Sequence, residues 1–280
     1  MTYYFCCPVC GNSLETDGKR CVCGKGHSFD LAAEGYAYLL QPNKKHSRTP
    51  GDDRQMVAAR RKLLDSGIYG LFAEKLAELA VSSARGREQI RLLDAGCGEG
   101  YYTAHTAESL RGAGITCDAG GFDISKAAVR AAAKRYRDVS FAVASTFGVP
   151  VADASVDCLT DVFAPIVPEE FGRVVRPGGT MILATPSKRH LYGLKEILYD
   201  EPYENEEQEI DYPGFSFIER VPVRGIAELD DPEMIWALFQ MTPYYWKTPE
   251  KGCEKLRAQR FLRTEIGFDF LVYRREPHSR

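Results

Sequence analysis

Three cysteines and one histidine near the start of the 280-residue sequence have the spacing of metal ligands. Cys7 and Cys10 form a Cys-x-x-Cys pair, and after twelve intervening residues Cys23 begins a second short pair that ends at His27. Two such pairs joined by a polar loop can place three thiolates and one imidazole around Zn²⁺ as a tetrahedron. Four protein ligands leave no position for water. We therefore expect a structural zinc ion that folds a segment too short to form its own core.

Two further cysteines leave a second ligand set open. Cys21 could replace His27 by pairing with Cys23, whereas Cys6 adjoins Cys7 and would break the usual Cys-x-x-Cys spacing. We favour the set that contains His27. Disulfide bonds are not expected, because the nine cysteines come without an export signal and five of them lie in the first 23 residues. Loss of zinc should unfold about the first forty residues and leave the rest folded.

A second chemical pattern is a run of alternating glycines near the middle of the chain. Residues 90–93 are mostly apolar and predict a buried parallel strand, and a helix can begin at Tyr101, so Gly96, Gly98 and Gly100 fall in a strand-to-helix turn. Without a Cβ, these residues let the main chain approach a bound molecule closely. A dinucleotide fingerprint requires Gly-x-Gly-x-x-Gly, but its third position here is Tyr101, which argues against NAD.

The segment from Asp94 to Gly100 is similar to the first motif of class I S-adenosylmethionine (SAM) methyltransferases. Two later features support this cofactor. Asp123 ends the expected second strand (115–122), where a carboxylate can accept both ribose hydroxyls of an adenosine. A Pro177-Gly178-Gly179 turn precedes an apolar strand over 180–184, an order that resembles the methyltransferases. We predict an α/β fold, a Rossmann-like class I methyltransferase sheet behind a small N-terminal zinc-binding module, with Asp94, Gly96, Gly98 and Asp123 at the cofactor.

Composition divides the chain into three parts. We expect a zinc-binding module over 1–38, a basic linker with helices over 39–83, and the methyltransferase domain over 84–280. Residues 36–51 should be linker, and Asp52 or Asp53 can cap the helix that follows. Residues 1–62 hold ten Lys and Arg against six Asp and Glu, and the remainder holds 26 against 33. This asymmetry predicts that the front of the chain meets a polyanion. The basic residues that could contact phosphates are Lys44, Lys45, His46 and Arg48.

Other patterns predict where the protein is found in the cell and what lies at the edge of its sheet. No apolar stretch approaches 18 residues and the N-terminus lacks the pattern of a signal peptide, so we expect a cytoplasmic protein. Residues 200–211 carry seven acids without a Lys or Arg and predict a solvated flap. Residues 215–223 and 266–273 should form an antiparallel pair at the sheet edge.

Together, several motifs resemble the RlmA-type guanine-N1 methyltransferases of large-subunit ribosomal RNA. Beside the zinc ligands they are Ser47-Arg-Thr-Pro-Gly-Asp52, Ala59-Arg60-Arg61, Gly67-Ile-Tyr69, Gly96-Cys-Gly-Glu-Gly-Tyr-Tyr-Thr103 and Thr185-Pro-Ser-Lys-Arg-His190. The resemblance implies zinc on Cys7, Cys10, Cys23 and His27, and SAM contacts by Tyr69, Glu99, Gly100 and His190. It also implies a homodimer that binds 23S ribosomal RNA rather than DNA or a membrane. In one departure, Ala104 separates Thr103 from His105, which weakens a catalytic role for that histidine.

This activity needs a general base, because N1 of neutral guanine carries a proton where the methyl group must go. Asp161, at the end of the fourth strand, is the first candidate, and His190, in the turn after the fifth strand, is the second. Two other functions compete. A small-molecule methyltransferase with a zinc lid is disfavoured by the basic front, and a non-catalytic zinc-containing RNA-binding protein is disfavoured by the intact glycine loop and Asp123.

Overall fold

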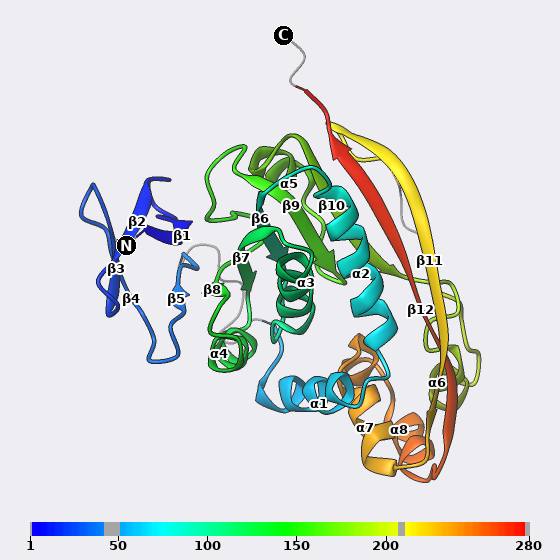
Figure 1. Ribbon diagram of the computed structural model, residues 1–280. Coiled ribbons are helices and arrows are strands. Elements are labelled where there is room, and N and C mark those ends of the chain that lie inside the picture. The colour runs from blue at the N-terminus through cyan, green and yellow to red at the C-terminus, as the bar shows by residue number, and fades with distance from the viewer. Residues whose placement is uncertain (1, 42–50, 207–210, 278–280) are drawn as a thin grey trace.

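The computed structural model describes residues 2–41, 51–206 and 211–277, which form two sheets (Figure 1). The small sheet is antiparallel and consists of β1 (Thr2–Cys6), β2 (Ser13–Thr16), β3 (Arg20–Cys23) and β4 (Ser28–Asp30). The large sheet has the order β11 (Phe215–Leu229), β12 (Leu262–Arg275), β10 (Val175–Pro186), β9 (Val156–Val162), β6 (Gln89–Ala95), β7 (Thr116–Asp123), β8 (Ser140–Val143) and β5 (Ala37–Tyr38).

The strands from β5 to β10 run parallel, while β12 is antiparallel to β10 and β11 is antiparallel to β12. The predicted antiparallel edge pair is therefore confirmed, although both of its strands are longer than predicted. The central strands β6 and β9 are almost wholly buried, as their apolar sequences require, whereas the edge strand β11 is largely exposed. The Pro-Gly-Gly turn lies inside β10, where the register shifts between Val175 and Thr180.

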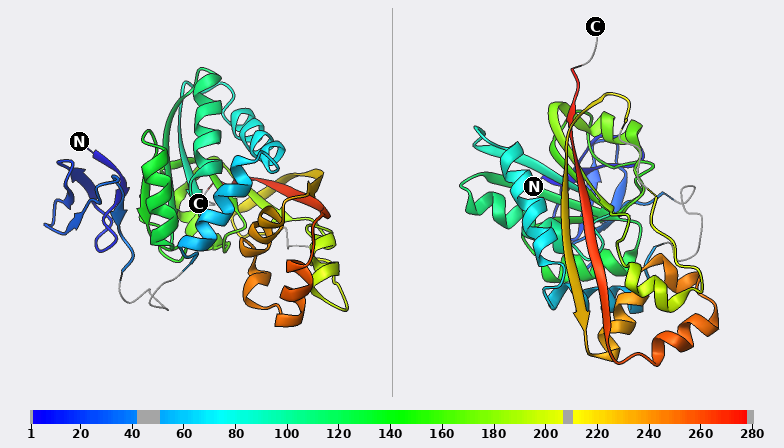
Figure 2. Two further views of the ribbon diagram at one scale, coloured as in Figure 1. Left: turned by 90° about the horizontal axis from the view of Figure 1, so that it is seen from below. Right: turned by 90° about the vertical axis from the view of Figure 1, so that its right-hand side faces the viewer.

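Helices cover both faces of the large sheet (Figure 2). They are α1 (Arg54–Asp65), α2 (Gly70–Ser83), α3 (Tyr101–Gly112), α4 (Lys126–Arg135), α5 (Pro168–Val174), α6 (Tyr192–Leu198), α7 (Pro232–Gln240) and α8 (Glu250–Arg257), with a short 3₁₀ helix η2 (Pro243–Trp246). Helices α2, α3 and α4 pack on one face and α5 on the other, which gives two separate apolar clusters. Asp53 caps α1, because its carboxylate accepts the N–H groups of Gln55 and Met56.

One prediction for the linker was wrong. Ala37 and Tyr38 were expected in a linker over 36–51, but they form β5 and extend the sheet beside β8. A two-residue strand is too short to give a periodic signal, so only pairing with β8 reveals it. The basic residues Lys44, Lys45, His46 and Arg48 lie outside the described residues.

The small sheet also shares a core with the large one. The Tyr4 ring can lie against β7 because Gly120 has no side chain. A Cβ at this position would be only 2.3 Å from the ring. The Tyr4 hydroxyl donates to the Leu92 carbonyl at 2.6 Å, and Phe5 belongs to the same apolar cluster as Leu93. The zinc segment is thus packed as part of the main fold, more closely than an independent module would be.

Candidate functional site

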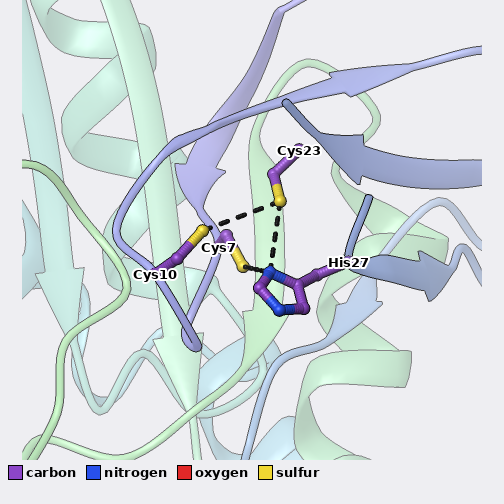
Figure 3. Close-up of side chains that lie close together, drawn as sticks. All are labelled: Cys7, Cys10, Cys23 and His27. Atoms are coloured by element: carbon purple, nitrogen blue, oxygen red, sulfur yellow. Dashed lines mark hydrogen bonds between the residues drawn. The ribbon is translucent and has the colours of Figure 1, made fainter. Parts of the chain in front are cut away.

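The four predicted metal ligands come together at one end of the small sheet (Figure 3). Nδ1 of His27 lies 3.5 Å from Sγ of Cys7 and 3.4 Å from Sγ of Cys23, and the Cys10 and Cys23 sulfurs are 3.7 Å apart. A tetrahedral zinc site with ordinary bond lengths has S–N edges of roughly 3.5 Å and S–S edges of roughly 3.8 Å. The donor set therefore fits one structural Zn²⁺, and its members are the four ligands that the sequence predicts.

Tight turns hold these ligands in place. The Gly11 N–H donates to the Cys7 carbonyl and the Gly26 N–H to the Cys23 carbonyl, both at 2.8 Å. Both glycines have positive φ, which glycine adopts without strain. Cys6 and Cys21, the alternative ligands, are buried and do not belong to the cluster.

A cavity of about 850 Å³ opens at the carboxyl ends of β6, β7, β9 and β10. In the sheet, β7 lies on one side of β6 and β9 lies on the other. The strand order therefore reverses at β6, next to this cavity. Open α/β sheets bind ligands at such a point. The cavity is lined by Tyr69, Asp94, Gly96, Gly98, Glu99, Asp123, Asp161 and His190, so almost every predicted cofactor and catalytic residue meets there. Gly100 lies directly behind the loop at the start of α3.

Steric constraints explain the glycine loop. Gly96, Gly98 and Gly100 have φ values of 71°, 54° and 80°, in the left-handed region. A Cβ on Gly96 would lie 2.2 Å from the Ala164 Cβ, and one on Gly100 would lie 2.8 Å from the Phe141 ring. Neither position has room for a side chain, so the loop can keep this path only with glycine.

Two carboxylates, of buried Asp94 and partly buried Asp123, hold the loop to the sheet. Asp94 accepts hydrogen bonds from the hydroxyls of Thr103 and Thr160, and burial raises its pKa to about 6. Asp123 accepts the Gly98 N–H at 3.0 Å through Oδ2 and the Ser125 N–H at 2.7 Å through Oδ1. Each oxygen of Asp123 keeps a second lone pair, so its carboxylate can still accept a ligand hydroxyl.

Three polar atoms at the cavity are buried without a hydrogen-bond partner among the described residues: the Tyr69 hydroxyl, Oε1 of Glu99 and Oδ2 of Asp161. The other oxygen of Glu99 pairs with Nε of Arg61 at 2.5 Å. Leaving a buried polar group unpaired costs about 1–3 kcal/mol, so such groups need a reason to persist. A polar ligand in the cavity would satisfy them.

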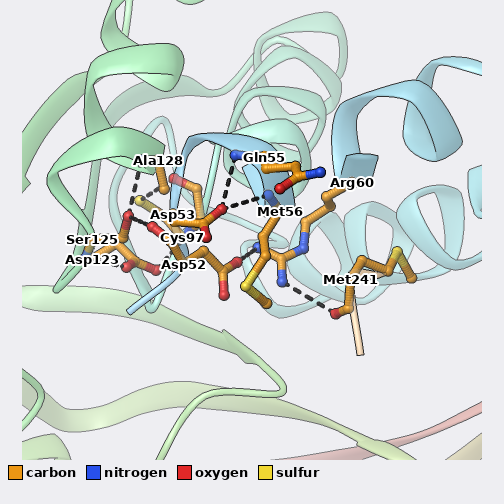
Figure 4. Close-up of polar contacts among 11 residues, drawn as sticks. Asp52, Asp53, Gln55, Met56, Arg60, Cys97, Asp123, Ser125, Ala128 and Met241 are labelled. Carbon is orange, nitrogen blue, oxygen red and sulfur yellow. Dashed lines mark hydrogen bonds and ion pairs between the residues drawn. The ribbon is translucent and has the colours of Figure 1, made fainter. Parts of the chain in front are cut away.

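The cavity contains a cation to which no sequence motif assigns a role. Arg60 supplies it, because no other lysine or arginine lines the cavity among the described residues. Figure 4 shows Arg60 extending from α1 to the Asp52 carboxylate and the Met241 carbonyl. Its Nη1 atom would be 3.7 Å from a Cβ on Gly98, which places the charge beside the glycine loop. A basic residue on the apolar, core-facing side of α1 was the signal in the sequence.

Asp161 is buried at the end of β9, and only one of its oxygens is paired. Oδ1 accepts the Ala164 N–H at 3.0 Å, while Oδ2 has no partner among the described residues. Burial raises the pKa of this carboxyl well above its usual range, and the charge of Asp94 adds to the effect. A carboxylate in this state binds a proton more strongly than an exposed one.

His190 has the opposite electrostatic character. Its Nδ1 accepts the Gly267 N–H at 3.1 Å, so the neutral ring carries its proton on Nε2 and acts there as a donor. Burial, helped by the charges of Lys195 and Arg224, lowers the pKa of His190 to about 3. His105, by contrast, lies on α3 beside Tyr101 and does not line the cavity.

The acidic segment is partly tied down. Lys195 is fully buried and donates to the Tyr203 carbonyl and to Oδ1 of Asn205, and Asn205 in turn donates to the Ser187 carbonyl. The carboxylate of Asp200 pairs with two lysines of α8. The described part of the predicted flap is therefore fastened beside the cavity.

Comparisons with known proteins agree with both sites. Residues 5–48 match the zinc-ribbon family model described as "RlmA, N-terminal", and residues 87–226 match a methyltransferase domain. The 23S rRNA (guanine(748)-N(1))-methyltransferase of Streptomyces fradiae is 37% identical over 198 residues, which cover 70% of this chain and 68% of that protein. A Bacillus subtilis (strain 168) protein, provisionally named a 23S rRNA (guanine-N(1)-)-methyltransferase, is 29% identical over 285 residues, 96% of each chain.

The fold has counterparts among solved structures. A provisionally named type II methyltransferase from Anaeromyxobacter dehalogenans superposes with a TM-score of 0.52 at 22% identity, covering 73% of this chain and 97% of that one. This similarity supports the predicted class of fold. None of the described helices is long and apolar enough to cross a membrane.

Proposed function

Because the chain belongs to the family of RlmA-type 23S rRNA (guanine-N1)-methyltransferases, we propose that it methylates N1 of a guanine in a hairpin loop of 23S ribosomal RNA. The observation that carries this proposal is the buried, half-paired carboxylate of Asp161 in the cavity beside the glycine loop. Within this cavity a base and a cofactor-binding loop lie together, as methyl transfer to a protonated nitrogen requires.

SAM supplies an electrophilic methyl group on a sulfonium sulfur that leaves as a neutral thioether. Oδ2 of Asp161 would take the N1 proton of guanine, which leaves the N1 electron pair free to bond to the methyl group. The proton on Asp161 would later pass to water. The raised pKa of Asp161 suits this step, because a base works best when its pKa lies near the working pH.

The remaining residues bind and orient. The fixed Nε2–H of His190 makes it a hydrogen-bond donor, so we assign it to binding and not to the alternative base role. Tyr69, Glu99 and the loop glycines would hold SAM through their free polar atoms and main chain, and Asp123 would accept the ribose hydroxyls. Arg60 would pair with the carboxylate at the methionine end, since it is the cation beside Gly98.

We also propose that the enzyme acts in the cytoplasm, where ribosomal RNA is found, and that it is a homodimer in which two chains bind one RNA, as the family resemblance implies. The basic front of the chain, with its zinc ribbon, would contact phosphates. We also propose the division into a zinc-binding module over 1–38, a linker with helices over 39–83 and a methyltransferase domain over 84–280. The zinc-binding module packs on the large sheet of the methyltransferase domain.

The direct test is methyl transfer from labelled SAM to 23S ribosomal RNA isolated without its native modifications, followed by mapping of the modified base. Label on N1 of one loop guanine supports the proposal. Label on small molecules only would favour a small-molecule methyltransferase, and SAM binding without any transfer would favour a non-catalytic RNA-binding protein.

A further inference from the structure

The turn that follows β9 contains a strained aromatic residue. Phe163 has φ of 61°, a left-handed conformation that costs a residue with a side chain about 1–2 kcal/mol. The turn is nevertheless closed on both sides: the Phe163 N–H donates to the Ala184 carbonyl at 3.3 Å, and the Ala164 N–H donates to Asp161. The strain therefore fixes the direction of this ring relative to the carboxylate two residues earlier.

The Phe163 ring is supported from behind and open in front. Its centroid lies 4.5 Å from that of Phe268 in an edge contact and 5.7 Å from that of His190. Phe268 in turn stacks on Phe72 at 4.1 Å, so the support is rigid. Phe163 nevertheless remains 47% exposed while it lines the cavity. An aromatic surface of this kind costs free energy in water unless a ligand covers it.

Charge and position identify the ligand class. Among the described residues that line the cavity, Arg60 beside Gly98 is the only lysine or arginine, so a phosphate is not the natural partner of Phe163. A planar heterocycle that stacks on the ring would present its edge to the unpaired Oδ2 of Asp161. The adenosine of the cofactor, which we assign to Asp123 at the end of β7, would lie on the other side of β6 from the end of β9.

On the basis of the proposed function, we infer that Phe163 is the platform on which the target guanine stacks when it leaves the RNA loop, with its N1 edge facing Asp161. Phe147 and Trp246, which are 65% and 67% exposed and line the same cavity, form further aromatic surface at its mouth. The strained turn thus holds the base platform and the general base as one unit.

The inference is tested by pairing a change in the ring with a change in the base. Two hairpin RNAs are compared, one with the mapped target guanine and one with an abasic site at that position. Wild-type protein loaded with S-adenosylhomocysteine should bind the RNA with the guanine more tightly than the abasic RNA. The ratio of the two affinities should be about 5- to 150-fold smaller in Phe163→Ala and in Phe163→Leu. Phe163→Trp should restore it. The control Phe261→Ala changes an exposed phenylalanine that does not line the cavity and should behave as wild type.

The possible results separate the two proposals. An unchanged preference in both the alanine and leucine variants, with the variants folded and S-adenosylhomocysteine bound normally, would overturn the platform. Loss of S-adenosylhomocysteine affinity in Phe163→Leu would overturn it too, because the ring would then serve the cofactor. A wild-type protein that transfers no methyl group to this RNA would instead refute the proposed function.

Discussion

At the residue scale, the cavity has a marked division of charge. Five carboxylates line it, from Asp52, Asp94, Glu99, Asp123 and Asp161, and Arg60 is the only permanent cation among its described residues. Asp94 and Asp123 accept bonds from hydroxyls or N–H groups, and Glu99 pairs with Arg61. Asp161 is buried with one oxygen unpaired, which leaves it available for proton transfer.

Asp161→Asn should lower the single-turnover rate of methyl transfer by about 10²- to 10⁴-fold, because it removes the base and keeps the shape. Affinity for S-adenosylhomocysteine and RNA should be unchanged. In the wild type the rate should rise with pH as Asp161 loses its proton. This rise should occur at a higher pH than for an ordinary carboxyl group, because the pKa of Asp161 is raised. Rates measured from pH 5 to 9 check this. An asparagine variant with wild-type turnover would assign the base elsewhere.

Arg60→Met should weaken S-adenosylhomocysteine binding by about 10- to 150-fold through loss of a charged hydrogen bond. Binding of methylthioadenosine, which lacks the amino-acid end, should not change, and calorimetry measures both. Arg54→Met is the matched control, because Arg54 is an exposed arginine on the same helix. Equal losses for both ligands would mean that Arg60 only supports the fold.

His190 should make stability depend on pH. Its folded pKa of about 3 lies below the ordinary value, so its stabilising contribution is complete above about pH 6.5 and is lost as the pH falls towards 3. The loss should reach about 2 kcal/mol at pH 5. His190→Gln can still accept the Gly267 N–H through its amide oxygen and has no titratable ring. Denaturant unfolding at pH 7 and pH 5 should therefore show a smaller acid loss in this variant, and equal losses would contradict the assignment.

At the scale of elements, the cavity is closed by segments that come from distant parts of the sequence. The β6–α3 loop lines it, and Arg60 in the middle of α1 reaches across to the Met241 carbonyl at the end of α7. Gly51 packs on Ile124 and Ser125, and the Ser125 hydroxyl donates to the Asp52 carbonyl at 2.5 Å. The loop, the turn after β9 and the start of α1 thus position one another.

Gly96→Ala tests the contact between the glycine loop and the turn after β9. The new methyl group would meet the Ala164 Cβ, so we expect at least a tenfold loss of S-adenosylhomocysteine affinity in calorimetry. Adding Ala164→Gly should restore only part of it, because the positive φ of Gly96 remains unfavourable for alanine. Full affinity in the single variant would show that the turn can move aside without cost.

At the scale of the whole molecule, the zinc ribbon and the large sheet stabilise each other. The hydroxyls of Tyr3 and Tyr4 donate to the carbonyls of Phe141 and Leu92, which belong to two strands of the large sheet. The chain after the ribbon then contributes β5 to the same sheet. A zinc ion on the four ligands would therefore stabilise this packing as well, because the ribbon covers apolar surface of β7 and β8.

His27→Ala should therefore release zinc and destabilise more than the first forty residues. Metal analysis should find less than one equivalent of zinc, the melting temperature should fall, and hydrogen exchange should rise in β7 and β8 as well as in β1–β4. His105→Ala, which lies outside both sites, is the control. Faster exchange confined to residues 2–41 would support an independent ribbon instead.

The sequence alone determined the features that depend on local chemistry. The spacing of Cys7, Cys10, Cys23 and His27 identified the metal ligands, because each pair must span one tetrahedral edge. The alternating glycines marked a close approach of backbone to a ligand, and the apolar character of residues 90–93 predicted β6 with small errors at its ends. These signals lie within a few residues of one another, so they survive without knowledge of the fold.

Tertiary structure alone decided what depends on distant segments. The role of Arg60 required α1 to meet Gly98 and Met241, and the donor role of His190 required the Gly267 N–H from β12. Strand β5 appeared only through its pairing with β8. Phe163 became informative through its backbone angle and its support by Phe268. Burial and pairing are set by residues far apart in the chain, and no local pattern records them.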